Sequence, residues 1–318
     1  MVKRTENIKQ LPDSSQRRFM LKAGALLPAT ALLGASGASY GAAMAPANSS
    51  VHTAKLGDFE VTTLLAGTRV ADNPQAIFGM NVSADEFATV SEANLIPVDK
   101  NRFYFNPSVV RAGSDVVLFD TGLNQKGILG ALEQAGLSAD DITVVVITHM
   151  HGDHVGGLIG EDGSATFPNA RLVTGQAEFD AWAKTDNERF AKVVKPMADK
   201  FDFIGDGASV VSGITSMAAF GHTPGHMTYM LESQGKQLVI AADTANHYVW
   251  SLAYPDWEVK FDMDKAAAAA TRRKVFGMLA ADKIPFLGYH MPFPGVGFVA
   301  PRDDGFQYVP VSYQLALE

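Results

Sequence analysis

The stretch THMHGDHVGG, residues 148–157, places three of the chain's eight histidines and one aspartate within six consecutive positions. It continues the β-branched, apolar run ITVVV, residues 142–146, which is typical of a buried strand. On an extended backbone, residues two apart face the same way, so the imidazoles of His149 and His151 can point at one centre. Because imidazole and carboxylate groups are common ligands of divalent cations, the stretch predicts a metal site.

The chain is expected to turn directly after His151. Gly152 allows a sharp turn, so the adjacent side chains of Asp153 and His154 can serve a second centre, distinct from the one that the first two histidines reach. The glycine pair at 156–157 permits a close approach of the backbone. One short segment therefore predicts ligands for two neighbouring centres.

The chain has 318 residues, of which 47% are hydrophobic, and it contains no cysteine. This length and apolar content can bury a substantial core. Disulfides are excluded, and every metal ligand must supply nitrogen or oxygen. The composition stays even after residue 47, without low-complexity tracts or repeats, so residues 48–318 are expected to form a single domain.

The first 47 residues differ from the rest. Six basic residues precede an Ala, Gly and Leu run at residues 23–38, which is typical of a secretory signal. The sequence RRFMLK, residues 17–22, places an arginine pair just before this run, as in twin-arginine signals. The run contains too many Gly and Pro residues for a spanning helix of about 20 apolar residues. We therefore expect export to the periplasm or the medium, without stable membrane insertion.

The charge of the mature chain argues against nucleic-acid binding. The whole chain has 26 basic and 34 acidic residues, of which 6 and 2 lie in the first 47, leaving 20 and 32 and a net charge of −12. Such a surface repels polyanions and anionic lipid. We therefore expect no nucleic-acid partner.

Strand and helix patterns alternate along the chain, which predicts an α/β or α+β fold with layered sheets. The segment 108–122 has two β-branched runs separated by AGSD and predicts a hairpin. Apolar residues at helical spacing predict a helix at 124–137. Further helices are expected at 175–183 and 266–281, and further strands at RLVTG, ITSMAAF, MTYMLES, KQLVIAA and IPFLGY.

The motif at residues 149–154 resembles the His-x-His-x-Asp-His signature of the metallo-β-lactamase superfamily. The further ligands that this resemblance implies follow in order: His222 in FGHTPGH, Asp243 in IAADTAN and His290 in GYHMPF. The sequence LFDTG, which contains Asp120, matches the strand and turn that lie beside the metals in this family. The set of ordered motifs covers the chain from about His52 to its end.

By this resemblance the fold is a four-layer αββα sandwich that binds two divalent metal ions. The ions would be zinc, with manganese, cobalt or iron as alternatives. The resemblance assigns His149, His151 and His222 to one metal, Asp153, His154 and His290 to the other, and Asp243 as the bridge. His226 is expected to fix the turn after His222 or to contact a ligand, rather than to bind metal itself.

Within the superfamily the chain is most similar to methyl parathion hydrolase and related secreted lactonases, in stretches such as LGDFEVT, FPNARLV and YVPVSY. β-Lactamases of the superfamily lack the bridging aspartate and often use a cysteine ligand. The resemblance therefore implies a binuclear hydrolase whose metal-bridging hydroxide cleaves a neutral lactone, ester or phosphotriester. Asp243 would hold the metals and Asp153 would also carry a proton.

The substrate pocket is expected from segments 68–106 and 244–262, which match the family least well. Candidate lining residues are His247, Trp250, Phe105 and Phe293. Alternatives are a mononuclear iron persulfide dioxygenase of the same superfamily, a β-lactamase, a nuclease, and an exported metal-binding protein without activity. The natural substrate, the metal, the signal cleavage position and a possible homodimer are left open by the sequence.

Overall fold

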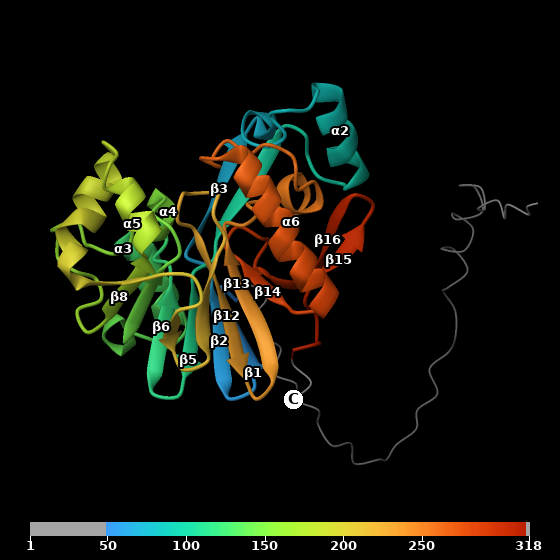
Figure 1. Cartoon of the computed structure of the whole chain (residues 1–318). Coiled ribbons are helices and arrows are strands. Elements are labelled where there is room, and N and C mark those ends of the chain that lie inside the picture. Colours follow the sequence, from blue (N-terminus) through green and yellow to red (C-terminus); the bar gives the residue numbers. More distant parts are fainter. Residues whose placement is uncertain (1–48, 316–318) are drawn as a thin grey trace, which may run out of the picture. The chain divides into compact units, whose positions relative to one another are not determined.

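The computed structural model describes residues 49–315, so the expected export signal at residues 1–47 lies outside the described residues. Two seven-stranded sheets dominate the fold (Figure 1). In spatial order, the first sheet contains β1 (Val51–Leu56), β2 (Phe59–Leu64), β5 (Ser108–Ala112), β6 (Asp115–Phe119), β7 (Val144–Ile147), β8 (Arg171–Gly175) and β9 (Phe201–Ile204). The second contains β10 (Ser209–Val211), β11 (Ile214–Ala218), β12 (Met227–Ser233), β13 (Lys236–Ala242), β14 (Phe286–Gly288), β15 (Val296–Arg302) and β16 (Gly305–Pro310).

Helices cover the outer faces of the two sheets. The first sheet is covered by α3 (Gln125–Gln134), α5 (Gln176–Trp182) and the irregular helical turns η3 (Phe190–Val194) and η4 (Lys195–Lys200). The second sheet is covered by the long helix α6 (Lys265–Asp282), which lies on the opposite side of the domain in Figure 1. The four-layer αββα sandwich predicted from the sequence is therefore confirmed.

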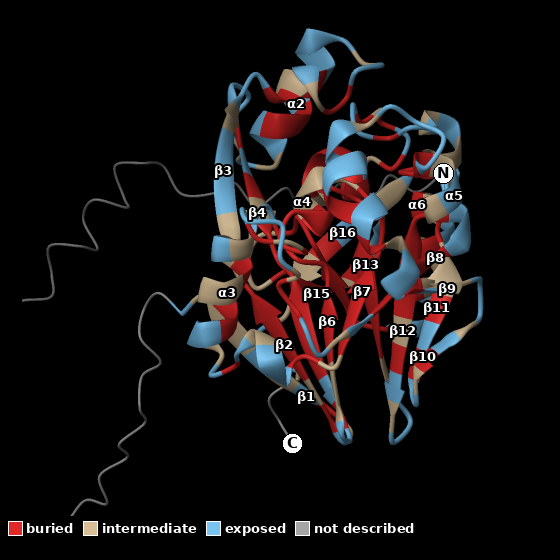
Figure 2. Ribbon diagram, turned by 90° about the vertical axis from the view of Figure 1, so that its left-hand side faces the viewer, coloured by how far each residue is buried: buried red, intermediate tan, exposed pale blue. Residues whose placement is uncertain are grey.

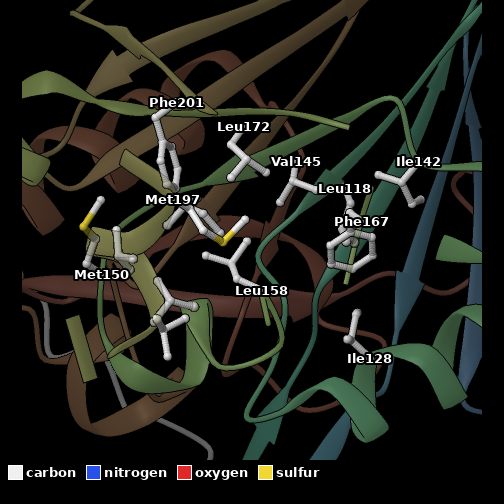
Figure 3. Close-up of a cluster of buried hydrophobic side chains, with 14 of the residues drawn as sticks. Leu118, Ile128, Ile142, Val145, Met150, Leu158, Phe167, Leu172, Met197 and Phe201 are labelled. Carbon is white, nitrogen blue, oxygen red and sulfur yellow. The ribbon is translucent and has the colours of Figure 1, made fainter. Parts of the chain in front are cut away.

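Three layers of apolar side chains fill the spaces between the four layers of helices and sheets. The outer face of the first sheet packs against α3 and α5 through residues such as Leu118, Val145 and Leu172 (Figure 3). Side chains from both sheets meet in the central layer, and α6 contributes Phe276 and Leu279 to the third. The buried residues concentrate on the strands, as the red colouring in Figure 2 shows. Burial of apolar surface on both faces of each sheet is the main stabilising term.

The elements expected from periodicity are present. Strand β7 is buried on both faces: Val144 and Val146 belong to the central layer, whereas Val145 and Ile147 face α3 and α5. The predicted hairpin is β5 and β6, and the predicted helices are α3, α5 and α6. Within the described part of the chain, no helix has the length and hydropathy needed to cross a membrane.

A separate aromatic cap lies beside the sandwich. It contains the two-stranded ribbon of β3 (Gly67–Asp72) and β4 (Lys100–Phe105), the short turn η1 (Pro74–Ala76), helix α2 (Ala84–Ala93) and the π-helical turn η5 (Tyr248–Ala253). Its apolar cluster includes Phe78, Phe103, Trp250 and Trp257. The structure thus packs together the two segments, 68–106 and 244–262, from which the sequence predicts the pocket.

Candidate metal centre

The predicted ligands lie in loops that follow the C-terminal ends of strands. His149 and His151 follow β7, and His222 follows β11. Asp243 and His290 follow β13 and β14, which run parallel to each other. Strand β11 points the same way as β13, because each is antiparallel to β12. The topology therefore brings residues separated by more than a hundred positions to one edge of the two sheets.

Three imidazoles form the first cluster. Nε2 of His149 lies 3.1 Å from Nδ1 of His151, which in turn lies 2.9 Å from Nε2 of His222. Ligand nitrogens around one tetrahedral zinc ion lie about 3.3 Å apart, given a zinc–nitrogen distance of about 2.0 Å. The three nitrogen atoms are thus close to the spacing that one divalent ion requires.

The second cluster contains Asp153, His154 and His290. Oδ2 of Asp153 lies 3.3 Å from Nε2 of His290 and 3.8 Å from Nε2 of His154. His154 is completely buried, whereas 23% of the Asp153 side chain is exposed. The turn after His151 is the short helix α4 (Gly152–Val155), so the adjacent side chains do reach a second centre as expected.

Asp243 lies between the two clusters. Its Oδ2 atom is 3.4 Å from Nε2 of His222 and 3.1 Å from Nε2 of His290, and its Oδ1 atom is 3.3 Å from Nε2 of His154. The preceding residue, Ala242, has a φ of 45°, a left-handed conformation that is uncommon outside glycine. This conformation directs the carboxylate into the position of a bridge between two metal ions.

The glycine pair after α4 allows the ligand loop to pack against the turn after β6. A Cβ atom on Gly156 would lie 2.2 Å from the Leu123 carbonyl oxygen, and one on Gly157 would lie 2.3 Å from that of Thr121. The same turn is joined to the motif by a hydrogen bond of 2.7 Å from the Thr121 amide to the His154 carbonyl. The close backbone approach predicted from the sequence is therefore confirmed.

Two buried polar atoms test whether this donor set fits metal ions. Nε2 of His154 and Oδ1 of Asp243 are both buried and lie 3.3 Å apart, but neither makes a hydrogen bond of good geometry to any of the described residues. Unpaired buried polar groups are costly, so a site of this kind requires a further partner. Imidazole nitrogens and carboxylate oxygens in convergent groups suit divalent ions, so the residues present fit a metal site.

The surroundings of the first cluster keep its imidazole nitrogens unprotonated, with lone pairs free to bind a metal. Burial, together with the charge of His154, lowers the pKa of His149 well below its usual value. Burial and the neighbouring His222 lower the pKa of His151 to about 3. These imidazoles are therefore neutral at pH 7, which is the state that binds a metal.

The carboxylates of the site are held ionised. Burial alone raises the pKa of Asp153, but the charge of His154 and a hydrogen bond from His290 bring it to about 2. Burial is also outweighed at Asp243, where the charges of His290 and His154 hold the pKa well below the usual range. The protein thus balances two negative charges with positive charge on these histidines, a balance that divalent cations can supply instead.

The two residues predicted to lie beside the ligands do contact them. Asp120 accepts hydrogen bonds from Nδ1 of His154 at 2.8 Å and from the amide and hydroxyl of Thr148 at 2.9 Å each. His226 donates from Nδ1 to the Ala219 carbonyl, and its Nε2 accepts from the Asp243 amide, both at 3.1 Å. Since both of its ring nitrogens are engaged, His226 orients the Asp243 backbone and has none left for a metal.

Asp262 contacts a ligand but was not predicted from the sequence. It accepts a hydrogen bond of 2.9 Å from Nδ1 of His222, which leaves Nε2 of that ring facing the cluster. Its other oxygen accepts from the buried guanidinium of Arg272 at 2.7 Å. Forty residues separate Asp262 from His222, and no spacing rule joins them.

Glu178 on α5 was also missed. Its Oε1 accepts from the Met150 amide at 2.9 Å and from the Trp182 indole at 2.7 Å. Its Oε2 accepts from the Thr223 hydroxyl at 2.7 Å and from the Gly225 amide at 2.8 Å. One buried carboxylate therefore ties together the two loops that carry the first cluster. The signal in the sequence is a glutamate four residues before a tryptophan, on the buried face of an expected helix.

Glu178→Gln should weaken metal binding at the first cluster by roughly 10- to 100-fold, the usual effect of losing such an orienting contact. Each carboxylate oxygen of Glu178 accepts from one pair of donors. The amide of glutamine has an N–H group in place of one oxygen, so one pair of donors loses its acceptor and the loop that it belongs to is released. Chelator competition that resolves both sites should show a much smaller loss of metal affinity at the second cluster. Asp180→Asn, on the exposed face of α5, is the matched control. Equal affinities for Glu178→Gln and wild type at both sites would refute the positioning role.

The clusters open into a cavity of about 360 Å³. Asp153, Asp243, His151 and His290 form its polar floor. Its walls are formed by Phe103, Phe105, Leu123, Phe261, Arg69 and Arg189. We refer to this space as the metal cavity.

The predicted pocket residues are divided between two cavities. Phe105 lines the metal cavity, whereas His247 and Trp250 line a neighbouring one. Phe293 lines neither of the two, because it lies in the turn that leads from His290 to β15. The prediction for Phe293 therefore receives no support from its position.

A family model described as the metallo-beta-lactamase superfamily matches residues 103–285, more than half of the chain. The match includes every predicted ligand except His290, which lies just beyond it.

Individual relatives are more distant. An N-acyl homoserine lactonase of Bacillus cereus is 26% identical over 120 residues, which cover 38% of this chain and 45% of that protein. The chain thus matches less than half the length of this curated relative. The solved structure of AidC, described as a dizinc quorum-quenching lactonase, has a TM-score of 0.78 and 27% identity and covers 83% of this chain and 98% of AidC. The hydrolase AbOPH, at 23% identity and a TM-score of 0.77, shares the fold over 85% of this chain and 100% of its own.

Proposed function

This chain belongs to the metallo-beta-lactamase superfamily, and we propose that it is a binuclear metal-dependent hydrolase of neutral lactones and related esters. The observation that carries the proposal is the position of Asp243, whose two oxygens lie within 3.4 Å of histidines from both clusters. A carboxylate placed in this way serves two ions rather than one. The structure of AidC, described as a dizinc lactonase, supports zinc at both positions.

Two bound zinc ions would supply a water of lowered pKa as the nucleophile and would polarise the scissile carbonyl group. His149, His151 and His222 would hold one ion and Asp153, His154 and His290 the other. Asp153 is the partly exposed carboxylate on the floor of the metal cavity. When Oδ2 binds the metal, its other oxygen, Oδ1, can accept the proton that the attacking water loses and can pass this proton to the leaving oxygen.

The aromatic part of the metal cavity wall suits a partly apolar molecule, and Arg69 and Arg189 add two cationic groups to the same wall. Phe103, Phe105 and Phe261 offer aromatic surface, and Phe103 and Phe105 have their ring centroids 5.7 and 5.5 Å from that of His290. An apolar wall directly beside a ligand excludes water from the reacting group and favours a substrate with an alkyl or aryl portion. Lactones, aryl esters and phosphotriesters share this character, and the lactonase relatives favour the first.

A substrate panel on metal-quantified protein tests this function. The value of kcat/KM for N-hexanoyl-homoserine lactone should exceed that for a phosphotriester or a β-lactam by at least about 10²-fold, the discrimination that a fitted pocket achieves. The kcat/KM values for aryl esters should lie between those for the lactone and those for the phosphotriester and the β-lactam. Preferred hydrolysis of the β-lactam would contradict the proposal, as would oxygen consumption with a persulfide by a single-iron protein. Activity in a periplasmic or culture fraction would support export through residues 1–47, which we also propose.

A further inference from the structure

A second cavity of about 460 Å³ lies beside the metal cavity. The two share His290, whose Nε2 faces Asp243 and whose Nδ1 donates a hydrogen bond of 2.8 Å to the Tyr104 carbonyl. Strand β4 contributes to both, because Phe103 and Phe105 line the metal cavity while Arg102 and Tyr104 line the second. This alternation follows from the period of two along a strand. The second cavity is therefore next to the reacting centre.

The position of the hydrogen on His247 can be derived from its contacts. Nδ1 of His247 accepts hydrogen bonds of 3.1 Å from the amides of Val249 and Trp250, which makes this residue the N-cap of η5. A neutral imidazole that accepts at one nitrogen must carry its hydrogen on the other. Nε2 is therefore an N–H donor. The side chain lines the second cavity, and Nε2 has no hydrogen-bond partner in residues 49–315.

The ring of His247 is held in one orientation. It stacks on the indole of Trp250 with centroids 4.1 Å apart and on the ring of Tyr248 at 4.7 Å, and Phe78 packs against it at 5.5 Å. The residue is only 7% exposed, and burial lowers its pKa to about 3, so the ring is neutral at pH 7. The donor is thus fixed before any ligand arrives, which reduces the entropy lost on binding.

The remaining lining of the second cavity favours a ligand with an acceptor oxygen. Ile96, Pro97 and Val70 provide apolar surface, while Lys100 and Arg102 are cationic, and no acidic side chain is among the lining residues. Neither cation has an ion pair among the described residues. A chain with an apolar body and a partly negative oxygen matches this surface.

We propose that the second cavity binds the part of the substrate remote from the scissile bond, an acyl chain whose carbonyl oxygen accepts a hydrogen bond from Nε2 of His247. This inference rests on the proposed lactone hydrolysis and deepens it. It makes His247 a residue that determines specificity, since a substrate without the carbonyl leaves a buried donor unpaired.

Two substitutions distinguish the role of His247 as a hydrogen-bond donor to the ligand from its role as the N-cap of η5. In His247→Asn the amide oxygen can accept from the Val249 and Trp250 amides, as expected of a good N-cap residue, but no group reaches the position of Nε2. In His247→Gln the longer side chain places an N–H group near the position of Nε2 and weakens the cap. His52→Asn, a histidine on β1 that lines neither of these two cavities, is the matched control.

The probes are N-hexanoyl-homoserine lactone and α-hexyl-γ-butyrolactone, which carry similar chains with and without the amide carbonyl. The ratio of their kcat/KM values should fall about 3- to 10-fold in His247→Asn, the effect of one lost hydrogen bond, mainly through a higher KM for the acyl compound. His247→Gln should keep the ratio within about twofold but lower the Tm. His52→Asn should change neither.

Failure of this inference differs from failure of the proposed function. A wild-type protein that hydrolyses neither lactone overturns both, whereas hydrolysis of both with an unchanged ratio in His247→Asn overturns the inference alone. Nitrogen-15 NMR of the wild-type protein provides a readout without turnover. The hydrogen of His247 should be on Nε2 at pH 7, and the Nε2 signal should shift when N-hexanoyl-L-homoserine is added. A hydrogen on Nδ1 would overturn the inference even if a variant failed to fold.

Discussion

Replacement of Asp243 by alanine should abolish metal binding and turnover together. Asp243 is the residue whose carboxylate lies within 3.4 Å of histidines from both clusters, so its loss removes a ligand from each ion. It also leaves His154 and His290 facing each other without the negative charge between them. We expect less than one ion per chain by elemental analysis and a fall in kcat/KM of more than about 10³-fold, because a ligand should matter more than the orienting contacts around it.

Asp243→Asn distinguishes the loss of charge from the loss of volume. The amide keeps the shape of the side chain, but it carries no charge and only one of its two atoms can coordinate a metal. The asparagine variant should therefore fold and still lose metal. Asp199→Ala, on the exposed surface of η4, is the control for a removed aspartate. An alanine variant with two ions per chain and wild-type kcat would rule out the bridging role.

Arg272→Ala should lower the free energy of unfolding strongly, and by more than the same substitution at the exposed Arg273. The guanidinium is 1% exposed and donates to Asp262 Oδ2 and to the Pro255 carbonyl at 2.7 Å, and to the Trp257 carbonyl at 3.3 Å. Its removal leaves a buried carboxylate and two carbonyls without their partner. Breaking a buried pair in this way costs about 3–5 kcal/mol of unfolding free energy.

The neighbouring arginine provides a control on the same helix. Arg273 is paired with Asp256 and Asp304, but 38% of its side chain is exposed, so Arg273→Ala should cost less than about 1 kcal/mol. Urea unfolding of both variants with metal present measures this difference. Arg272→Ala should also weaken the first metal site, because Asp262 no longer holds His222 as firmly. Equal losses of stability in the two variants would contradict this account.

The ligand motif was predictable because local geometry determines it. Two histidines at a spacing of two on a strand end must face the same way, and the adjacent Asp153 and His154 must diverge from them at a turn. The strands before His222, Asp243 and His290 were likewise visible as apolar runs. The resemblance to the superfamily supplied the pairing of these ligands, which spacing alone cannot give.

The contacts around the ligands were mostly not predictable. Glu178 and Asp262 each bind a loop 28 to 47 residues away, and such partners are defined only by how the layers pack. The aromatic cap is a similar case, since Phe78 in one segment and Trp250 in the other, together with further apolar side chains, meet in one cluster only after the chain has folded. Asp120 was identified because LFDTG is itself part of a recognisable motif.

Anomalous diffraction from crystals of the mature protein, recorded on both sides of the zinc absorption edge, tests the central claim most directly. Two zinc peaks should appear about 3.5 to 4 Å apart, one among His149, His151 and His222 and the other among Asp153, His154 and His290, with Asp243 contacting both. A single peak at the iron edge in the first cluster, with Asp243 directed away from any second ion, would contradict the account.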